Sequence, residues 1–216
     1  MVIVLCLVLT WRQNSYWRGE IPLFERAVRF EPHLGRARVL LGKAYYFNRE
    51  YDRAIVEYQS ALKIMQGYIG QIRRGTARRA QQSAFAQASA EQFYWGWVKG
   101  ISFDLAHCHE GKHDYLQAIA DYNQALAVDP RDGVIRNNIG TDYLYLNNIE
   151  AAQKSFLSAL GLNPRDVLAM TNLAVCHLQK GEDREAERLL RQALTVAPDF
   201  PSAKTNLEKL MKKSKE

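Results

Sequence analysis

The sequence predicts an all-α solenoid built from repeated helical hairpins. A pattern of two short amphipathic helices joined by a tight turn runs from Gly133 to Pro164 and recurs, 34 residues later, from Val167 to Pro198. Proline returns at the same interval, beginning with Pro130, and each proline ends a helix because it lacks an N–H group and disfavours helix at the residue before it. A fixed period of this size indicates a repeat architecture.

The predicted helix starts and packed faces follow the same period. Asp132 and Asp166 stand where a carboxylate can accept from the free N–H groups of a helix's first turn. Small residues recur where two helices would touch closely, and larger residues fill the spaces between them. The small sets are Gly42, Ala106, Gly140 and Ala174; Ala54, Ala118, Ala152 and Ala186; and Ala27, Ala61, Ala125, Ala159 and Ala193. The large sets are Tyr58, Tyr122, Phe156 and Leu190, and Leu41, Leu105, Ile139 and Leu173.

This pattern resembles the tetratricopeptide repeat (TPR) family. The repeat length, the small residues at its eighth, twentieth and twenty-seventh positions and the proline at its thirty-second position all match. The resemblance implies a right-handed superhelical solenoid that ends in a capping helix. The predicted divisions are an apolar segment at 1–12, a partial repeat at 13–34, repeats at 35–68, 99–132, 133–166 and 167–200, an insertion at 69–98 and a cap at 201–216. The repeat at 35–68 departs from the pattern, because Gln66 replaces the proline.

The first apolar run, VIVLCLVL at residues 2–9, is apolar on every side, unlike the other first helices. It is too short to cross a bilayer, which takes about 20 residues, and no basic region precedes it as in a secretory signal. One interpretation is a truncated first helix. The other, which we favour, is the end of a transmembrane helix, because aromatic and basic residues follow at once. We therefore expect membrane association through the N-terminus, with a cytoplasmic protein as the alternative.

The stretch from Trp11 to Pro32 adds to the membrane interpretation. It is similar to the junction between the last membrane span and the first repeat in membrane glycosyltransferase-like proteins of the O-mannosyltransferase type, which carry TPR tails. This resemblance implies a substrate-presenting C-terminal domain of a membrane enzyme, whose catalytic residues would precede Met1. Within the junction, Pro22 predicts a helix that begins near Glu20.

Most of the chain's formal net charge of +6 lies in and around the insertion at 69–98. Between Lys63 and Gly100, six basic residues stand against one acid, Glu91. We expect a loop around Gly75, followed by a helix that lengthens the first helix of the next repeat. A contact surface on the insertion would use Arg73, Arg74, Arg78, Arg79, Trp95 and Trp97.

Three interpretations of the insertion stay open. The simplest is a solvated arginine face with the aromatic residues packed as a local lid. The second is a protein or membrane contact, in which arginines meet acidic or phosphate groups. The third and least favoured is nucleic acid, whose backbone would meet the arginines while its bases stack on the aromatic rings.

A row of asparagines is the most informative surface feature. Asn138, Asn172 and Asn206 occupy the sixth position of three successive first helices. A primary amide offers both a donor and an acceptor, so such a row can pair with the backbone of an extended peptide. In the TPR family this position faces the concave surface, and the row resembles the asparagine ladders that hold peptides in glycosyltransferases acting on protein. Asn137, Thr141 and Tyr145 are expected to line the same groove; the alternative is that these asparagines bond locally or to water.

Other binding and catalytic chemistry is not indicated. No nucleophile motif or phosphate-binding glycine loop occurs, so we expect a binding module without a cofactor rather than an enzyme. His107, Cys108 and His109 suggest a metal, but their repeat positions favour packing, and the unpaired spacing of the cysteines predicts buried free thiols. The TPR clamp for a C-terminal carboxylate is not met, because Val39, Leu40 and Asp104 stand where its lysine and asparagines should be.

Overall fold

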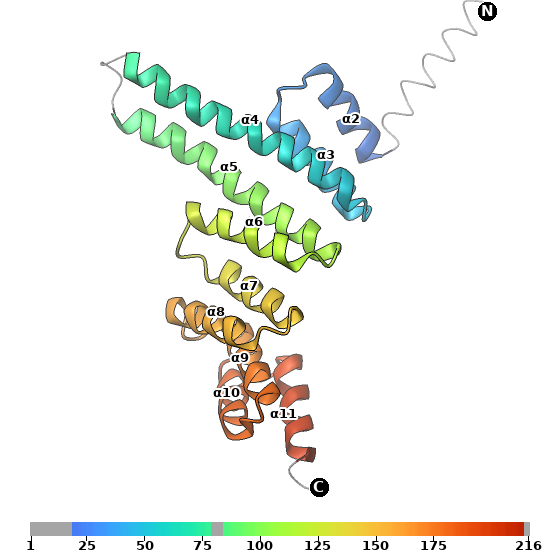
Figure 1. The fold of residues 1–216 in the computed structure, drawn as a ribbon, viewed down its shortest axis with the longest axis vertical. Coiled ribbons are helices and arrows are strands. Elements are labelled where there is room, and N and C mark those ends of the chain that lie inside the picture. Colours follow the sequence, from blue (N-terminus) through green and yellow to red (C-terminus); the bar gives the residue numbers. More distant parts are fainter. Residues whose placement is uncertain (1–18, 79–83, 214–216) are drawn as a thin grey trace, which may run out of the picture. The chain divides into compact units, whose positions relative to one another are not determined.

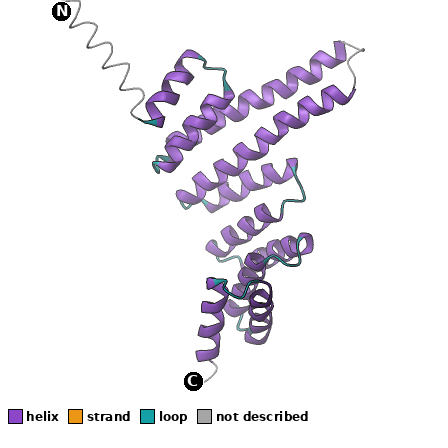
Figure 2. Ribbon diagram, turned by 180° about the vertical axis from the view of Figure 1, so that it is seen from behind, coloured by secondary structure: helices purple, strands orange, loops and turns teal. Residues whose placement is uncertain are grey.

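The computed structural model describes residues 19–78 and 84–213, which form ten α-helices and no strand (Figures 1 and 2). The chain divides into two compact units, Met1–Asp114 and Tyr115–Glu216. The prediction of an all-α helical-repeat fold is confirmed. The predicted apolar segment at 1–12 lies outside the described residues.

The first unit contains four described helices, α2 (Glu20–Phe30), α3 (Gly35–Phe47), α4 (Tyr51–Arg78) and α5 (Ala84–Gly111). Helix α2 begins at Glu20 with Pro22 in its first turn, as the sequence predicted. The two longest helices, α4 and α5, have 28 residues each, which corresponds to about 42 Å of helix. They lie side by side, and both contact α3 (Figure 1).

The expected loop around Gly75 is wrong, because α4 continues through this residue to Arg78. A glycine in a helix interior costs only about 1 kcal/mol relative to alanine. Burying an apolar side chain contributes about 1.5–3 kcal/mol, and Met65, Ile69 and Val98 are all buried in the α4–α5 region. The expected extension of the following first helix is confirmed, since α5 runs unbroken from Ala84 into the next repeat.

The second unit contains six helices in the described residues. They are α6 (Tyr115–Val128), α7 (Gly133–Tyr145), α8 (Ile149–Leu162), α9 (Val167–Gln179), α10 (Asp183–Val196) and α11 (Pro201–Lys213). Helices α7 and α9 begin as the sequence predicted, because the Asp132 and Asp166 side chains accept from backbone N–H groups in the first turns. Helix α11 packs on α9 and α10, so it covers the end of the stack.

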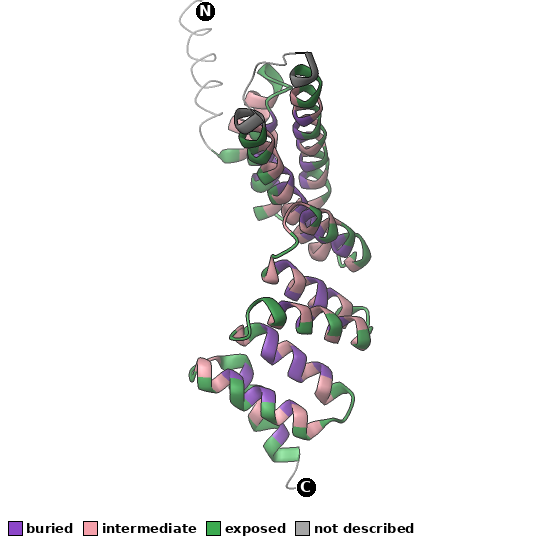
Figure 3. Cartoon of the chain, turned by 90° about the vertical axis from the view of Figure 1, so that its left-hand side faces the viewer, coloured by how far each residue is buried: buried purple, intermediate pink, exposed green. Residues whose placement is uncertain are grey.

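In two hairpins, α3–α4 and α7–α8, the core depends on a glycine that faces a large ring. A Cβ atom on Gly42 would lie 2.9 Å from the Tyr58 ring, and one on Gly140 would lie 2.5 Å from the Phe156 ring. Buried residues alternate with exposed and partly buried ones along the helices (Figure 3). The predicted small and large sets are buried, with the exception of the partly exposed Ala27.

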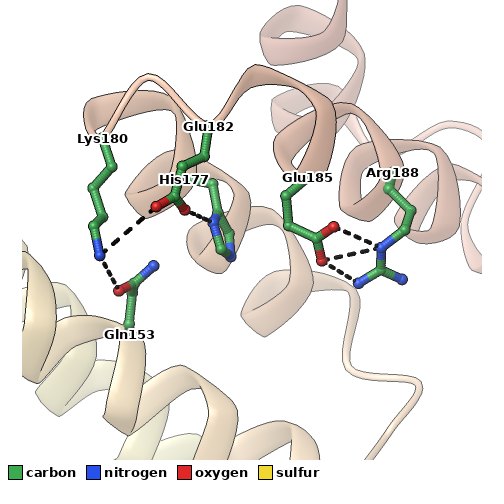
Figure 4. A network of polar contacts seen from close by, with 6 residues as sticks. All are labelled: Gln153, His177, Lys180, Glu182, Glu185 and Arg188. Carbon is green, nitrogen blue, oxygen red and sulfur yellow. Dashed lines mark hydrogen bonds and ion pairs between the residues drawn. The ribbon is translucent and has the colours of Figure 1, made fainter.

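The turn within each hairpin uses a left-handed residue at a matching position. Arg49, His113, Asn147 and Gly181 have φ values of 62°, 61°, 57° and 73°. Only Gly181 adopts this conformation without a steric cost from Cβ. The turn at Gly181 is also closed by side chains: His177 Nδ1 lies 2.5 Å from Glu182 Oε2 (Figure 4).

The same turn is tied to the preceding repeat. Lys180 Nζ donates to Gln153 Oε1 of α8 at 3.1 Å and lies 3.9 Å from Glu182 Oε1 (Figure 4). The Glu185–Arg188 ion pair, by contrast, joins two residues of α10 and does not connect this helix to the preceding repeat. Exposed ion pairs contribute only about 0–1 kcal/mol each, so these contacts orient the turn more than they stabilise the fold.

We predict opposite effects from two glycine-to-alanine substitutions in the second unit. Gly140→Ala should lower the free energy of unfolding by about 1–3 kcal/mol, because the new methyl group collides with the Phe156 ring. Gly161→Ala should raise it by up to about 1 kcal/mol, because a methyl group there meets no atom within 4 Å and alanine favours helix. Urea denaturation of both variants measures the difference. Equal stability of the two variants would contradict the packing described here.

We also predict that Cys176 resists alkylation in the folded protein. Its thiol is fully buried, and burial raises its pKa to about 11. The thiolate is the reactive form, so at pH 8 the residue should stay protonated and unmodified until the chain unfolds. Iodoacetamide labelling with and without urea, followed by peptide mass spectrometry, tests this. Rapid labelling of Cys176 without denaturant would show that the thiol is accessible.

Candidate functional site

The three predicted asparagines lie on the first helices of the second unit. Asn138 is on α7, Asn172 on α9 and Asn206 on α11, and each is partly exposed. Helix α9 contacts both α7 and α11. The structure therefore places the three amides at equivalent positions of helices that follow one another in direct contact.

Two of the three amides are held by other polar side chains. Asn172 Nδ2 donates to Asn137 Oδ1 at 3.1 Å, and Asn138 Nδ2 donates to the Tyr122 hydroxyl at 3.2 Å. An amide side chain can make about four hydrogen bonds, so each retains a carbonyl oxygen and one N–H. Among the described residues, the Asn206 side chain makes no hydrogen bond.

Asn137 has a different place from the one expected. Its side chain is only 3% exposed, so the expectation that it lines an open groove needs correction. It accepts from Asn172, and its backbone carbonyl accepts from Thr141 Oγ1 at 3.1 Å. Asn137 thus supports the Asn172 amide from inside the unit. It occupies the fifth position of its repeat, which points toward the next repeat, whereas Asn138 at the sixth position is partly exposed.

Tyr145 lies at the exposed end of the same face. Its ring is 66% exposed and is stacked on Tyr115, with 4.7 Å between ring centroids and 7° between planes. Stacking of this kind restricts both rings and presents one aromatic face to solvent. Tyr145 was predicted from the sequence, whereas Tyr115 of α6 was not, because no pattern in the sequence marks it.

The two predicted arginines of the insertion whose side chains are described, Arg73 and Arg74, both contact other groups of the chain. Arg73 Nε lies 3.2 Å from Glu91 Oε2 of α5, and its guanidinium group lies 5.8 Å from the Trp95 ring centroid. Arg74 Nε donates to the Gly70 carbonyl oxygen at 3.1 Å. The Arg78 side chain and the whole of Arg79 lie outside the described residues. The antiparallel packing of α4 and α5 therefore brings the single acid of the insertion to Arg73.

Trp97 contacts Arg36, an arginine that was not predicted as a site residue. The Arg36 guanidinium group of α3 lies 5.3 Å from the Trp97 ring centroid and 5.6 Å from that of Phe93. Both distances are within the range of cation–π attraction. No sequence signal connects Arg36 with residues about 60 positions away, because only the packing of α3 near α5 brings them together.

A cavity of about 280 Å³ opens beside these rings, between α3 and α5. Its lining combines apolar, aromatic and charged side chains with two glycines. The lining residues are Val39, Lys43, Phe93, Gly96, Trp97, Gly100, Ile101 and Asp104. The spacing of Gly96 and Gly100, four residues apart on one helix face, is the signal that could have indicated this cavity.

Asp104 and Lys43 form the polar part of the lining. Lys43 Nζ lies 3.7 Å from Asp104 Oδ2. Burial raises the pKa of the Asp104 carboxyl, while Lys43 and His107 act in the opposite direction. The Asp104 oxygens can accept hydrogen bonds at the cavity wall, and the neighbouring Lys43 ammonium group can balance the charge of the ionised form.

Metal chemistry has no support in the described part of the chain. Within residues 19–78 and 84–213, no group of three His, Cys, Asp or Glu residues could hold a metal ion. His107 instead lies 2.7 Å from Glu110 Oε2 and meets the Phe103 ring edge-on. Over the same residues, no helix is both long enough and apolar enough to cross a bilayer.

Solved structures similar to this chain contain TPR domains. MamA has 14% identity over 86% of this chain and 91% of its own, with a TM-score of 0.64. The first TPR of Spaghetti (RPAP3), bound to the HSP90 peptide SRMEEVD, has 18% identity over 55% of this chain and 94% of its own, with a TM-score of 0.52. The TPR domain of Arabidopsis OM64 has 17% identity over 53% of this chain and 95% of its own, with a TM-score of 0.51. At these identities the likeness concerns the fold.

Family models give the same assignment from the sequence. Tetratricopeptide repeat models match residues 35–65, 101–132 and 137–204, which together make up more than half of the chain. No curated protein matches. The match over residues 137–204 includes Asn138 of α7 and Asn172 of α9 and ends just before Asn206 of α11. The chain belongs to the tetratricopeptide repeat family.

Proposed function

We propose that this protein is an interaction scaffold that holds an extended segment of a partner protein along the first helices of its second unit. The observation that carries the proposal is the row of partly exposed amides at Asn138, Asn172 and Asn206, on helices α7, α9 and α11. Amides at a repeating position can pair with the backbone of an extended chain whatever its side chains are.

The support behind the amides favours this function. Asn137 accepts a hydrogen bond from Asn172, and Tyr122 accepts one from Asn138, so two of the three side chains are oriented before a ligand arrives. A side chain that is already ordered loses less conformational entropy on binding. Each oriented amide still offers hydrogen-bonding groups to a partner's backbone.

Apolar side chains on the same helices can add contact area. Val134 of α7 and Leu168 of α9 are one repeat apart and are 61% and 46% exposed. Tyr145, stacked on Tyr115, extends this surface at the end of α7. Such contacts supply affinity, whereas the amides set the register of the backbone.

The similar RPAP3 domain supports peptide binding as the function of this fold, since its structure contains an HSP90 peptide. The present chain differs at the positions that would clamp a C-terminal carboxylate, with Val39, Leu40 and Asp104 in place of lysine and asparagine. We therefore propose an internal segment of the partner, and not a free C-terminus, as the ligand.

The test is peptide selection followed by substitution. A phage-displayed library of random linear peptides is selected on the full chain, and affinities of the enriched peptides are measured by fluorescence polarisation. Combined Asn138→Ala, Asn172→Ala and Asn206→Ala substitution should weaken binding at least about tenfold, because each lost hydrogen bond costs about 0.5–1.5 kcal/mol.

The control is a double variant, Lys154→Ala and Thr195→Ala, on the exposed surfaces of the second helices α8 and α10. It should bind like the unmodified chain, and circular dichroism should show equal helix content in all three proteins. Failure to select any peptide, or equal affinity of the triple variant, would refute the proposal.

A further inference from the structure

We propose that the cavity between α3 and α5 is an anchor site for a tyrosine side chain of a partner protein, with an acidic residue beside that tyrosine recognised by Arg36. This inference rests on the proposed function and adds a side-chain specificity to it. The cavity lies wholly within the first unit, whereas the asparagine row belongs to the second unit.

The size and lining of the cavity suit an aromatic ring. Its volume is about 280 Å³, whereas an apolar cavity of about 150 Å³ already holds benzene. Val39 and Ile101 form a buried apolar part of the lining, and Phe93 and Trp97 supply aromatic surfaces. Phe93 is 51% exposed, which leaves apolar surface in contact with water until a ligand covers it.

Two glycines keep the cavity open. A Cβ atom on Gly96 or Gly100 would meet no atom within 4 Å, so neither glycine is required by packing within the chain. Gly42 is the opposite case, since its Cβ would collide with Tyr58. Each helical glycine costs about 1 kcal/mol relative to alanine. Space for an external side chain gives a reason for these two residues at positions that line the cavity.

The charges around the cavity favour an acidic segment. Arg36 stacks over the Phe93 and Trp97 rings and forms no ion pair with any described carboxylate. Lys43 is paired with Asp104, so among these three side chains the positive charge of Arg36 is left. A carboxylate next to the anchor residue can make charge-assisted hydrogen bonds to the Arg36 guanidinium group, whereas a basic neighbour would be repelled.

Asp104 can recognise the phenolic hydroxyl of the bound tyrosine. Its carboxylate lies in the cavity lining, where it can accept a hydrogen bond from a phenolic hydroxyl. A buried tyrosine hydroxyl usually finds such a partner, whereas a phenylalanine would offer Asp104 no hydroxyl group. The insertion at 69–98 contributes Phe93, Gly96 and Trp97, so the anchor site depends on residues that lie outside the repeat period.

The experiment is an NMR titration of the ¹⁵N-labelled full chain with capped peptides. The probe is N-acetyl-Glu-Tyr-Glu-amide, and the comparison peptides replace tyrosine by alanine or both glutamates by lysine. The probe should shift the amide signals of Gly96 and Gly100 saturably. The alanine peptide should leave them unchanged, and the lysine peptide should bind at least about tenfold more weakly. Equal shifts with the alanine peptide would overturn the inference.

A matched pair of variants localises the effect. Gly100→Leu fills the cavity and should abolish the shift of Gly96. Gly67→Leu places the same side chain on α4, also in open space but away from the cavity, and should leave the response intact. Thermal melts should show that both variants stay folded, since leucine favours helix more than glycine. Undiminished binding by Gly100→Leu would overturn the inference.

The two proposals can fail separately. The triple asparagine variant should respond to the Glu-Tyr-Glu probe like the unmodified chain, because its substitutions lie in the other unit. Selection of peptides that depend on the asparagines, combined with no response at Gly96 and Gly100, would overturn the anchor site alone. A response at Gly96 and Gly100, combined with failed peptide selection, would overturn the asparagine row alone.

Discussion

The close approach of two helices within each hairpin is the constraint on which the rest of the structure depends. A glycine on the first helix leaves room for an aromatic ring from the second, as at Gly42 with Tyr58 and at Gly140 with Phe156. Rings that are almost fully buried in this way contribute several kcal/mol each to a domain whose net stability is small. Because this contact uses one face of the first helix, other faces remain for the next repeat and for solvent.

Polar contacts then connect the repeat of α7 and α8 to the repeat of α9 and α10. The Asn172–Asn137 hydrogen bond joins α9 to α7, and the Lys180–Gln153 hydrogen bond joins the turn after α9 to α8. The first contact is partly buried and lies beside the proposed peptide-binding surface, whereas the second is exposed. The same amides therefore hold neighbouring repeats together and present hydrogen-bonding groups outward, which links the stability of the stack to its recognition surface.

The first unit differs from the second in its two long helices, α4 and α5. Helices α4 and α5 each have 28 residues, about twice the 14 residues of α8 or α10. Their packing places Arg73 against Glu91 and Trp95, so part of the insertion's positive charge is compensated within the chain. Arg36 stacks on aromatic rings and forms no ion pair with a described carboxylate. It lies beside the part of α5 where Gly96 and Gly100 leave space.

The sequence alone determined the helical repeats, because its signals are local or strictly periodic. Proline positions, the capping residues Asp132 and Asp166 and the recurring small residues place the helices and their packed faces without knowledge of distant contacts. Only the tertiary structure decided that Gly75 lies in a helix, where packing of α4 against α5 exceeds the local cost of glycine. It also decided the partners of Asn137, Arg36 and Arg73, since these contacts join residues on separate helices and no local pattern in the sequence records which helices meet.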